Sequence, residues 1–549
     1  MYSYSFAQNP KWTSFFPSGS EIVRYLYDVC EKYGLLDKIQ LDTGVTGIKW
    51  IEEDEEWEVT LEHMAAGAGE MTSKERAKLA VEKGSQAVCV KTEIVRAKVV
   101  CSAVGGLIEP KENPKVPGLD TFEGSILHTA RWDESVDLHG KDVVLLGTGC
   151  SAAQVLPQLI KPEHGVKSVT QLLRSPPWAV PGPPEAALEW WKKWMPTLCT
   201  LIPGYQIAVR KFLFTMLEIE FVTLFSPTEK ARENRKAKRQ ELVDHLNSLV
   251  PEQYREILTP DYEVFCKRRV IDVDWYKSLQ RDNVEITSMP MTAVGRNSVT
   301  LGPGRQYPPM SKTESSAPTE QKTIAADIII MANGYETGEW LHPLDVTGRN
   351  GQSMYDLWEQ RGGAQAYMGT AMDGFPNFFL IFGPNTATGH SSVILASENM
   401  VNYSLNFIKP IMNGEVRTYE VKEEAERKWT TDIQSQLKNS VFQSGGCKSW
   451  YYKADSGWNS TVYPRTQIDY TIRCMFPQYS HWTATYTKKG LLMYYFRLTL
   501  KLFAALSTVY GLIYIYKNGR KASRDQIVRL VGRLRGYVQN VLDALRSRV

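Results

Sequence analysis

A glycine turn between an apolar strand and a helix is the feature that most constrains the fold of this chain. Residues 143–146 form an apolar run short enough for a buried parallel strand, and helix-forming residues follow residue 152. The turn has the pattern G-x-G-x-x-A and comprises Gly147, Thr148, Gly149, Cys150, Ser151 and Ala152. Its first glycine permits a tight turn, its second admits a pyrophosphate to the backbone, and its alanine packs helix on strand. An isolated turn of this kind can be purely structural, but its context favours dinucleotide binding by these residues and Gln154.

The end of the next strand indicates which dinucleotide binds. Residues 168–173 have the pattern of a second strand, and Arg174 and Ser175 follow it. An acidic residue at this position would bind a free ribose 2′-hydroxyl, whereas an arginine suits a 2′-phosphate. The sequence therefore favours NADPH over NADH. The alternative is that Arg174 is a solvated surface residue.

Composition bounds the class of protein. With 549 residues, of which 43% are hydrophobic, the chain can bury a large core and should form two or more domains. A net charge of +3 without a long basic stripe argues against nucleic acid as a partner. The first residues lack the apolar region of a signal peptide. The eight cysteines show neither C-x-x-C pairs nor metal-ligand spacing, which predicts free thiols in a reducing, cytoplasmic compartment and no metal site.

A second motif ends shortly before the glycine turn. It has the spacing Phe122-x-Gly124-x3-His128-x3-Trp132-Asp133. Taken singly, its histidine or tryptophan would be an ordinary core or hinge residue. The complete spacing, with the nucleotide turn directly after it, resembles the fingerprint of Baeyer–Villiger monooxygenases. These enzymes use NADPH, FAD and O2 to insert an oxygen atom beside a carbonyl group, and the resemblance implies a catalytic role for His128.

The resemblance extends over residues 2–485 and implies an α/β fold with two dinucleotide-binding, Rossmann-like domains. The expected organisation is a first part of the flavin domain at 1–131, an NADPH domain at 132–324 with a helical insertion at 185–260, a discontinuous second part of the flavin domain at 325–488, and a C-terminal helical tail at 489–549. Residues 62–86 have the composition of an insertion on a hairpin, and 98–103 that of a buried strand. We expect the aromatic residues of the helical insertion to pack a core beside the substrate pocket, and the charge run 230–239 to be a solvated helix face.

The segment FCKRR, residues 265–269, resembles the part of the family that carries the catalytic arginine, which corresponds to Arg268. Oxygen insertion builds a negative oxygen on the carbonyl carbon, and a fixed cation stabilises that charge. Arginine suits this role because it keeps its charge at any working pH. On the residues alone, a pair of arginines is more often a surface feature. The aspartate that positions this arginine in the family has no counterpart here.

Other cofactor contacts are implied by the resemblance alone. Val45 belongs to a strand-like piece of the flavin domain, and Asn333 and Gly334 end a buried strand where the chain returns to that domain. Asn385 lies in a glycine-rich loop expected beside the flavin ring. Trp450 lies in a segment that closes over the nicotinamide in the family, although it could equally be a core aromatic.

One block of the family pattern has no counterpart in this sequence. It comprises an opening strand, a G-x-G-x-x-G turn for the FAD pyrophosphate and an acidic ribose ligand. The chain resembles the family from just after that block. We therefore expect a shortened gene model or a degenerate copy, with weak FAD binding by these 549 residues.

The tail departs from the family. Residues 498–516 are apolar except for Lys501 and a few small polar residues, which is marginal for a membrane span of about 20 residues. Residues 527–545 carry apolar residues at helical spacing, and the region 517–549 has nine Lys/Arg and two Asp, a net charge of +7. This pattern predicts association with the cytoplasmic side of a membrane through 490–549. The alternative is a helical hairpin that packs on the protein itself or on a second copy.

The sequence thus predicts an NADPH- and FAD-dependent monooxygenase that oxidises a small organic ketone with O2. Oxygenation of nitrogen or sulfur is one alternative. A flavin-free NADPH-binding remnant and a membrane-tethered scaffold without catalysis are the others.

Overall fold

The computed structural model of the chain describes residues 2–303, 320–338, 340–453, 455–518 and 532. The chain forms two compact units, Met1–Lys409 with Thr418–Thr483, and Pro410–Arg417 with Ala484–Val549. The basic helix expected over 527–545 lies outside the described residues.

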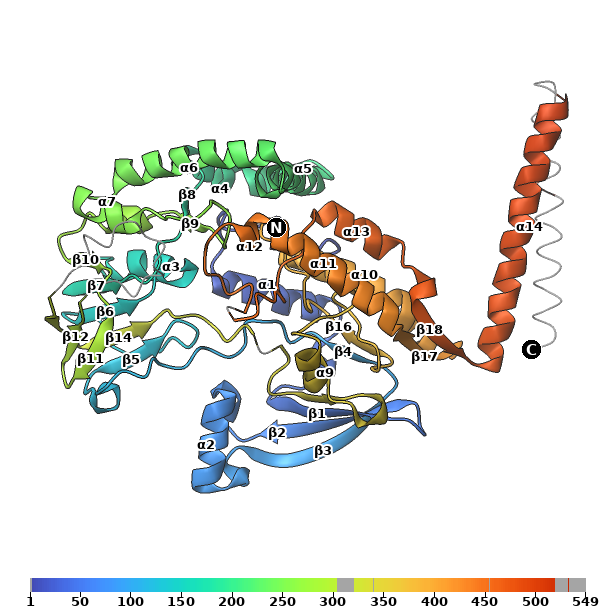
Figure 1. Cartoon of the computed structure of the whole chain (residues 1–549), viewed down its shortest axis with the longest axis horizontal. Coiled ribbons are helices and arrows are strands. Elements are labelled where there is room, and N and C mark those ends of the chain that lie inside the picture. Colours follow the sequence, from blue (N-terminus) through green and yellow to red (C-terminus); the bar gives the residue numbers. More distant parts are fainter. Residues whose placement is uncertain (1, 304–319, 339, 454, 519–531, 533–549) are drawn as a thin grey trace. The chain divides into compact units, whose positions relative to one another are not determined.

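A five-stranded parallel sheet organises the nucleotide-binding part of the first unit (Figure 1). Its strands, in spatial order, are β10 (Val284–Thr287), β7 (Ser168–Leu172), β6 (Asp142–Leu146), β14 (Ile328–Met331) and β5 (Ser125–His128). Helix α3 (Cys150–Leu159) packs Ala152 and Leu156 in one core cluster with Val143 and Leu145 of the sheet. The strands predicted at 143–146 and 168–173 and the helix after the glycine turn are therefore confirmed.

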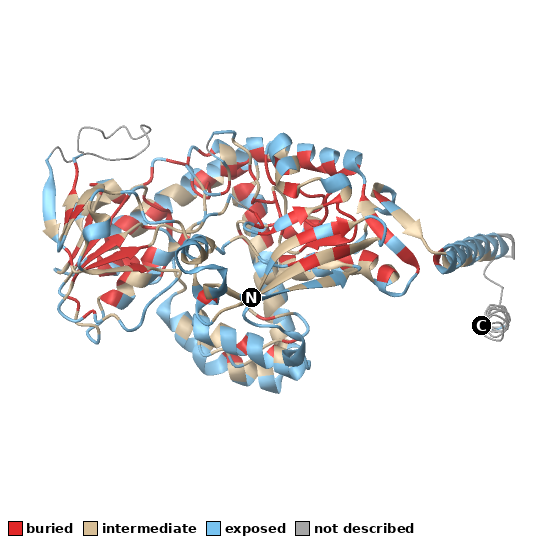
Figure 2. Cartoon of the chain, turned by 90° about the horizontal axis from the view of Figure 1, so that it is seen from below, coloured by how far each residue is buried: buried red, intermediate tan, exposed pale blue. Residues whose placement is uncertain are grey.

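A small antiparallel sheet covers the opposite face. It consists of β11 (Met291–Gly295), β12 (Ser298–Leu301) and β13 (Lys322–Ala325). Val299 and Leu301 of this sheet pack with Val144 and Met331 of the parallel sheet. Both faces of the parallel sheet are thus buried, as its colouring in Figure 2 shows, which explains why β6 and β14 are almost entirely apolar.

Two further sheets of the first unit are formed by strands within residues 43–102 and 345–380. An antiparallel meander of β1 (Thr43–Ile51), β2 (Glu56–Met64) and β3 (Cys89–Ala97) is joined by the parallel strand β15 (Asp345–Thr347). Helix α2 (Ser73–Lys83) lies between β2 and β3 in the chain, which confirms the insertion on a hairpin. Strand β4 (Val100–Ser102) pairs in parallel with β16 (Phe378–Leu380). The strand predicted at 98–103 is confirmed, but its full burial is not: Cys101 is exposed, because only β16 pairs with β4 in the described structure.

Helices form the insertion in the nucleotide-binding part, as predicted. They are α4 (Glu185–Leu201), α5 (Tyr205–Glu220), a π-helix at Phe221–Phe225, α6 (Glu229–Leu249) and α7 (Glu252–Leu258). Phe221 and Phe225 are buried and stack on each other. Trp190, Trp194 and Phe212 are exposed, so the expected aromatic core is wrong for them. The physical reason is that α4 and α5 each bury a single residue in the described structure.

The charge run 230–239 is a solvated face only in part. Arg235 on α6 is buried, and its guanidinium donates to a carboxylate oxygen of Glu263 at 3.0 Å and to the carbonyl of Leu224 at 2.8 Å. The expectation is therefore wrong at this position, because the fold supplies partners for the buried charge.

The remaining elements of the first unit are α1 (Gly19–Lys32), β8 (Ala179–Pro181), β9 (Val270–Asp272), α8 (Trp275–Ser278), α9 (Met354–Gln360), α11 (Glu423–Asn439), α12 (Val441–Ser444) and α13 (Gln467–Met475). Three elements run from one unit into the other: α10 (Val393–Met412), β17 (Val416–Val421) and β18 (Trp482–Tyr486). Helix α1 begins after Ser18, whose hydroxyl accepts a hydrogen bond from the Glu21 N–H at 3.2 Å.

The second unit contains the long helix α14 (Lys488–Asn518). The Arg497 guanidinium forms two hydrogen bonds with the Glu415 carboxylate, at 2.8 and 3.0 Å. The segment Lys488–Tyr514 is long and apolar enough to cross a membrane, and none of its most apolar window is buried. The apolar run predicted at 498–516 is thus helical, and Leu502, Leu506 and Ile513 within it are exposed.

Two of the eight cysteines expected as free thiols are joined. Cys266 and Cys447 form a disulfide. The free cysteines are Cys30, Cys89, Cys101, Cys150, Cys199 and Cys474. The expectation is wrong for this pair, because the fold brings together two cysteines that lie 181 residues apart in the sequence.

Candidate active site

The glycine turn has the geometry that a bound pyrophosphate requires. Gly147 follows β6 with φ of +111°, and a Cβ there would lie 2.7 Å from the carbonyl oxygen of Ala332, so only glycine fits. Gly149 is the N-cap of α3, with open space where a side chain would be. Ala152 is fully buried beneath the helix, whereas Ser151 and Gln154 are exposed. The turn therefore offers an unobstructed backbone and a helix N-terminus to an anion.

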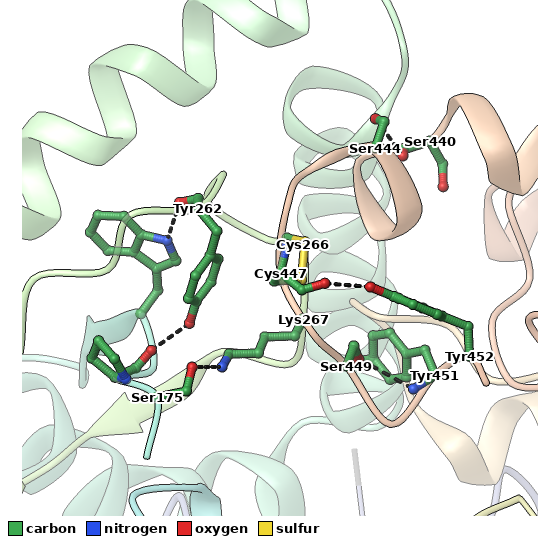
Figure 3. The surroundings of a disulfide bond; sticks show 12 residues. Ser175, Tyr262, Cys266, Lys267, Ser440, Ser444, Cys447, Ser449, Tyr451 and Tyr452 are labelled. Atoms are coloured by element: carbon green, nitrogen blue, oxygen red, sulfur yellow. Dashed lines mark hydrogen bonds between the residues drawn. A yellow bond between two sulfur atoms is a disulfide. The ribbon is translucent and has the colours of Figure 1, made fainter. Parts of the chain in front are cut away.

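Two cations and a hydroxyl come together at the end of β7. Arg174 is exposed, and the neighbouring Ser175 accepts a hydrogen bond at its hydroxyl from the Lys267 ammonium at 2.9 Å (Figure 3). The hydroxyl of Thr148 donates to the Ser175 carbonyl at 3.0 Å, which ties this group to the glycine turn. Burial, together with repulsion by Arg174, lowers the pKa of Lys267 to about 8. A bound phosphate would relieve that repulsion.

The sequence motifs did not indicate Lys267 as a site residue. It stands inside the run Lys267-Arg268-Arg269, where any of the three cations could be the functional one. Its only sequence signal was its place directly before the arginine implied by the family pattern.

The structure separates the two arginines of this run. Arg269 forms an ion pair with Glu220 of α5 through both guanidinium Nη atoms. Arg268 is exposed and has no ion pair among the described residues. Tyr451 lies close enough to Arg268 to be affected by its charge. Burial raises the pKa of Tyr451 to about 12, and the positive charge of Arg268 lowers it. Among the three cations of this run in the described structure, Arg268 is the one without a hydrogen bond or ion pair to another residue, which leaves its charge available to an anion.

His128 and Asn333 are brought together at the ends of adjacent parallel strands. His128 Nδ1 accepts a hydrogen bond from the Ala130 N–H at 3.0 Å, which leaves Nε2 to donate to Asn333 Oδ1 at 2.8 Å. Burial lowers the pKa of His128, which favours this neutral tautomer. Asn333 also donates to the Glu112 carbonyl at 2.9 Å, and Gly334 next to it has φ of +91°. His128 thus links the end of β5 to Asn333, which follows β14, and its catalytic role stays a prediction.

The other expected cofactor contacts are dispersed. Val45 is exposed on β1, where the pairing with β2 has a bulge. Asn385 is buried and donates to the carbonyls of Asn459 at 2.7 Å and Val462 at 3.2 Å. Trp450 is 42% exposed, its ring packs against Tyr451, and its carbonyl accepts from the Thr337 hydroxyl at 3.4 Å.

The fit of the two cofactors differs. The glycine turn and the cation group fit NADPH. On the flavin side, the Ser102 hydroxyl on β4 is buried without a partner, and open space lies beside Gly105 in the loop that follows. These features can accommodate part of a flavin, but no second turn of the pattern G-x-G-x-x-A or G-x-G-x-x-G follows a strand of a parallel sheet in the described structure. Among the described residues, the turn at 147–152 is therefore the only one of this pattern.

A parallel sheet with a phosphate-binding turn, beside a free arginine, defines a nucleotide-dependent enzyme of the two-domain α/β class. Comparison with models of protein families gave no match. The chain is 31% identical to a Baeyer–Villiger monooxygenase of Pseudomonas aeruginosa over 466 residues, which cover 84% of this chain and 77% of that protein. It is 30% identical to a Baeyer–Villiger monooxygenase of Streptomyces coelicolor over 478 residues, which cover 86% and 79%. The chain belongs to the Baeyer–Villiger monooxygenase family.

Solved structures share the fold. A steroid monooxygenase bound to NADP matches with a TM-score of 0.65 and 22% identity, over 88% of this chain and 89% of that one. The OTEMO protein in complex with FAD and NADP matches with a TM-score of 0.64 and 20% identity, over 86% of each chain. The predicted α/β fold with two dinucleotide-binding domains is thereby confirmed.

Proposed function

We propose that this chain is a monooxygenase that uses NADPH, FAD and O2 to insert one oxygen atom next to the carbonyl carbon of a small ketone. Its family supports the reaction type. The observation that carries the proposal is the exposed Arg268, which directly follows Lys267 of a cation group suited to the 2′-phosphate of NADPH. The domain boundaries at residues 131, 324 and 488 belong to the same proposal.

The residues of the chain have separate tasks in this scheme. Gly147 and Gly149 present backbone N–H groups to the pyrophosphate, and Arg174, Ser175 and Lys267 bind the 2′-phosphate. Arg268 stabilises the negative oxygen that develops on the substrate carbonyl, because a fixed cation needs no reorganisation when the charge appears. FAD, when bound, supplies the redox chemistry with O2.

The test measures product and cofactor together. The purified chain, supplied with FAD and NADPH, is given a panel of cyclic and linear ketones under ¹⁸O2, and esters or lactones are identified by mass spectrometry. One ¹⁸O per product supports the proposal. Arg296→Ala, at an exposed arginine, serves as the matched control for Arg268→Ala. NADPH binding without flavin binding or oxygenated product would instead indicate a flavin-free remnant.

We also propose that α14 anchors the chain to the cytoplasmic side of a membrane. The segment Lys488–Tyr514 has 27 residues, which at about 1.5 Å per residue exceed the roughly 30 Å of a bilayer core. Leu502, Leu506 and Ile513 are exposed along it, and the sequence after Tyr516 carries a charge of +7 that attracts anionic lipids.

Cell fractionation tests the anchor. We expect the full chain to remain with membranes after a high-salt wash and to be released by detergent. Leu506→Arg/Ile513→Arg should move it to the soluble fraction, since charge within the bilayer core is costly. A wild-type chain that is soluble without detergent would contradict the anchor.

A further inference from the structure

The Cys266–Cys447 disulfide joins two segments that carry candidate site residues. Cys266 directly precedes Lys267 and Arg268, whereas Cys447 directly precedes the segment that contains Trp450. Both cysteines are buried, at 0% and 4% exposure. Figure 3 shows Lys267 extending from one side of the bridge toward Ser175, and Tyr452 reaching the other side. The bridge is thus placed to couple the arginine segment to the Trp450 segment.

The backbone on the Cys266 side is held in an unfavourable conformation. Phe265 has φ of +69°, which a bulky residue adopts only when its surroundings enforce it. Its ring is buried against Phe225, at 4.7 Å between centroids, and Arg269 lies over it. Because Arg268 follows Phe265 by three residues, the conformation of this turn sets the direction of the Arg268 side chain.

Further contacts that hold this turn come from the Cys447 side. The Glu263 N–H donates to the Gly445 carbonyl at 2.9 Å, and the Cys447 N–H donates to Cys266 Sγ at 3.1 Å. A Cβ at Gly445 would lie 2.9 Å from Cys266 Cβ and Sγ, so the two segments are in tight contact. A hydrogen bond between neutral groups contributes only modest net stability, so the covalent bridge adds to what holds the two segments together.

The bridge also orders the segment that follows Cys447. The Tyr452 hydroxyl donates to the Cys447 carbonyl, and Tyr451 is buried close enough to Arg268 to feel its charge. Trp450, which directly precedes Tyr451, remains 42% exposed. The bridge therefore fixes the base of a short loop whose Trp450 side chain is partly exposed.

We propose that the Cys266–Cys447 disulfide is a redox latch that positions Arg268 against the Trp450 segment, so that reduction lowers oxygenation without unfolding the chain. The effect on oxygenation rests on the proposed function. The reductant is a dithiol, such as a small dithiol or a protein with two neighbouring thiols. Its two thiols transfer two electrons and two protons: the Sγ–Sγ bond breaks, Cys266 and Cys447 become thiols, and the reductant becomes a disulfide.

The first test follows the latch without using activity. The full chain, loaded with FAD and NADPH, is digested and mapped before and after dithiothreitol, with alkylation of free thiols. We expect one cross-linked peptide pair before reduction and two additional alkylated cysteines after it. Hydrogen exchange should then rise in 262–269 and 445–452 and stay unchanged in β6 and β7. Free Cys266 and Cys447 thiols in the untreated folded chain, or unchanged exchange after reduction, would overturn the latch.

The second test measures its consequence. Because a displacement of about 1 Å can cost up to ~10²-fold in rate, we expect reduction to lower kcat for oxygenation by about ten- to a hundredfold. The amount of product per NADPH oxidised should also fall, which a purely structural role would not cause. Cys266→Ala/Cys447→Ala should match the reduced protein and ignore dithiothreitol. Cys474→Ala, which removes a buried free thiol, should keep the full response.

The two proposals fail in different ways. If hydrogen exchange changes as expected but neither the oxidised nor the reduced chain oxygenates any ketone, the structural effect of the disulfide is supported and the proposed function is refuted. If the oxidised chain oxygenates ketones and reduction changes neither its product yield per NADPH nor its kcat, the latch is overturned and the function stands.

Discussion

Two of the parallel sheets in the first unit differ in completeness. The five-stranded sheet β10-β7-β6-β14-β5 is covered on both faces, and the glycine turn follows its central strand β6. The β4–β16 pair has two strands of three residues each, an exposed Cys101 and an unpartnered Ser102 hydroxyl. We infer from this difference that the nucleotide site is built by the sheet itself, whereas the flavin side depends on loops and neighbouring segments. Substitutions on the two sides should therefore have separable effects.

The largest expected effect separates chemistry from nucleotide binding. Arg268→Ala should lower the rate of oxygenation by ~10²–10³, because the developing oxyanion loses its fixed cation. The dissociation constant for NADPH should change little, since the glycine turn and Arg174 are untouched. Stopped-flow kinetics and a fluorescence titration with NADPH measure the two quantities. An equal loss in both would show that Arg268 serves the nucleotide site instead.

The next effect compares matched glycines after β6 and β4. Gly147→Ala should destabilise the chain by about 3 kcal/mol, because φ of +111° and the Ala332 carbonyl at 2.7 Å both exclude a methyl group. Gly105→Ala should cost only about 1 kcal/mol, since its φ is +78° and the space beside it is open. Urea unfolding of both variants measures the difference. Similar losses for the two would contradict the contrast between the sheets.

The third effect concerns nucleotide choice. NADPH should be preferred over NADH by at least about tenfold, or ~1.4 kcal/mol, through charge-assisted contacts of its 2′-phosphate with Arg174 and Lys267. Arg174→Ala should shrink this preference chiefly by weakening NADPH. Steady-state kinetics with both cofactors is the measurement, with Arg296→Ala as control. Equal use of both cofactors by the unmodified chain would refute the assignment.

Sequence reasoning succeeded where function depends on local pattern. The strand 143–146, the glycine turn and the helix after it form one continuous stretch, so spacing and hydrophobicity sufficed. It failed where the fold joins distant residues: neither the Cys266–Cys447 bridge nor the burial of Arg235 leaves a local signal. Lys267 was missed because three adjacent cations look alike in sequence, and only packing assigns each a different partner.

The smallest effect is a pH dependence that should appear for NADPH alone. Burial and Arg174 hold the pKa of Lys267 at about 8, below the ordinary value for lysine. Below that pH the ammonium is charged and can pair with the 2′-phosphate. Above it the free protein loses this proton, so binding must first restore it. The dissociation constant for NADPH should therefore rise between pH 7 and 9, by no more than about tenfold, while that for NADH stays flat.

Lys267→Met should flatten the NADPH profile, whereas Lys322→Met, at a lysine paired with Glu285 on the surface, should preserve it. Parallel profiles for NADPH and NADH in the unmodified chain would show that Lys267 does not bind the phosphate.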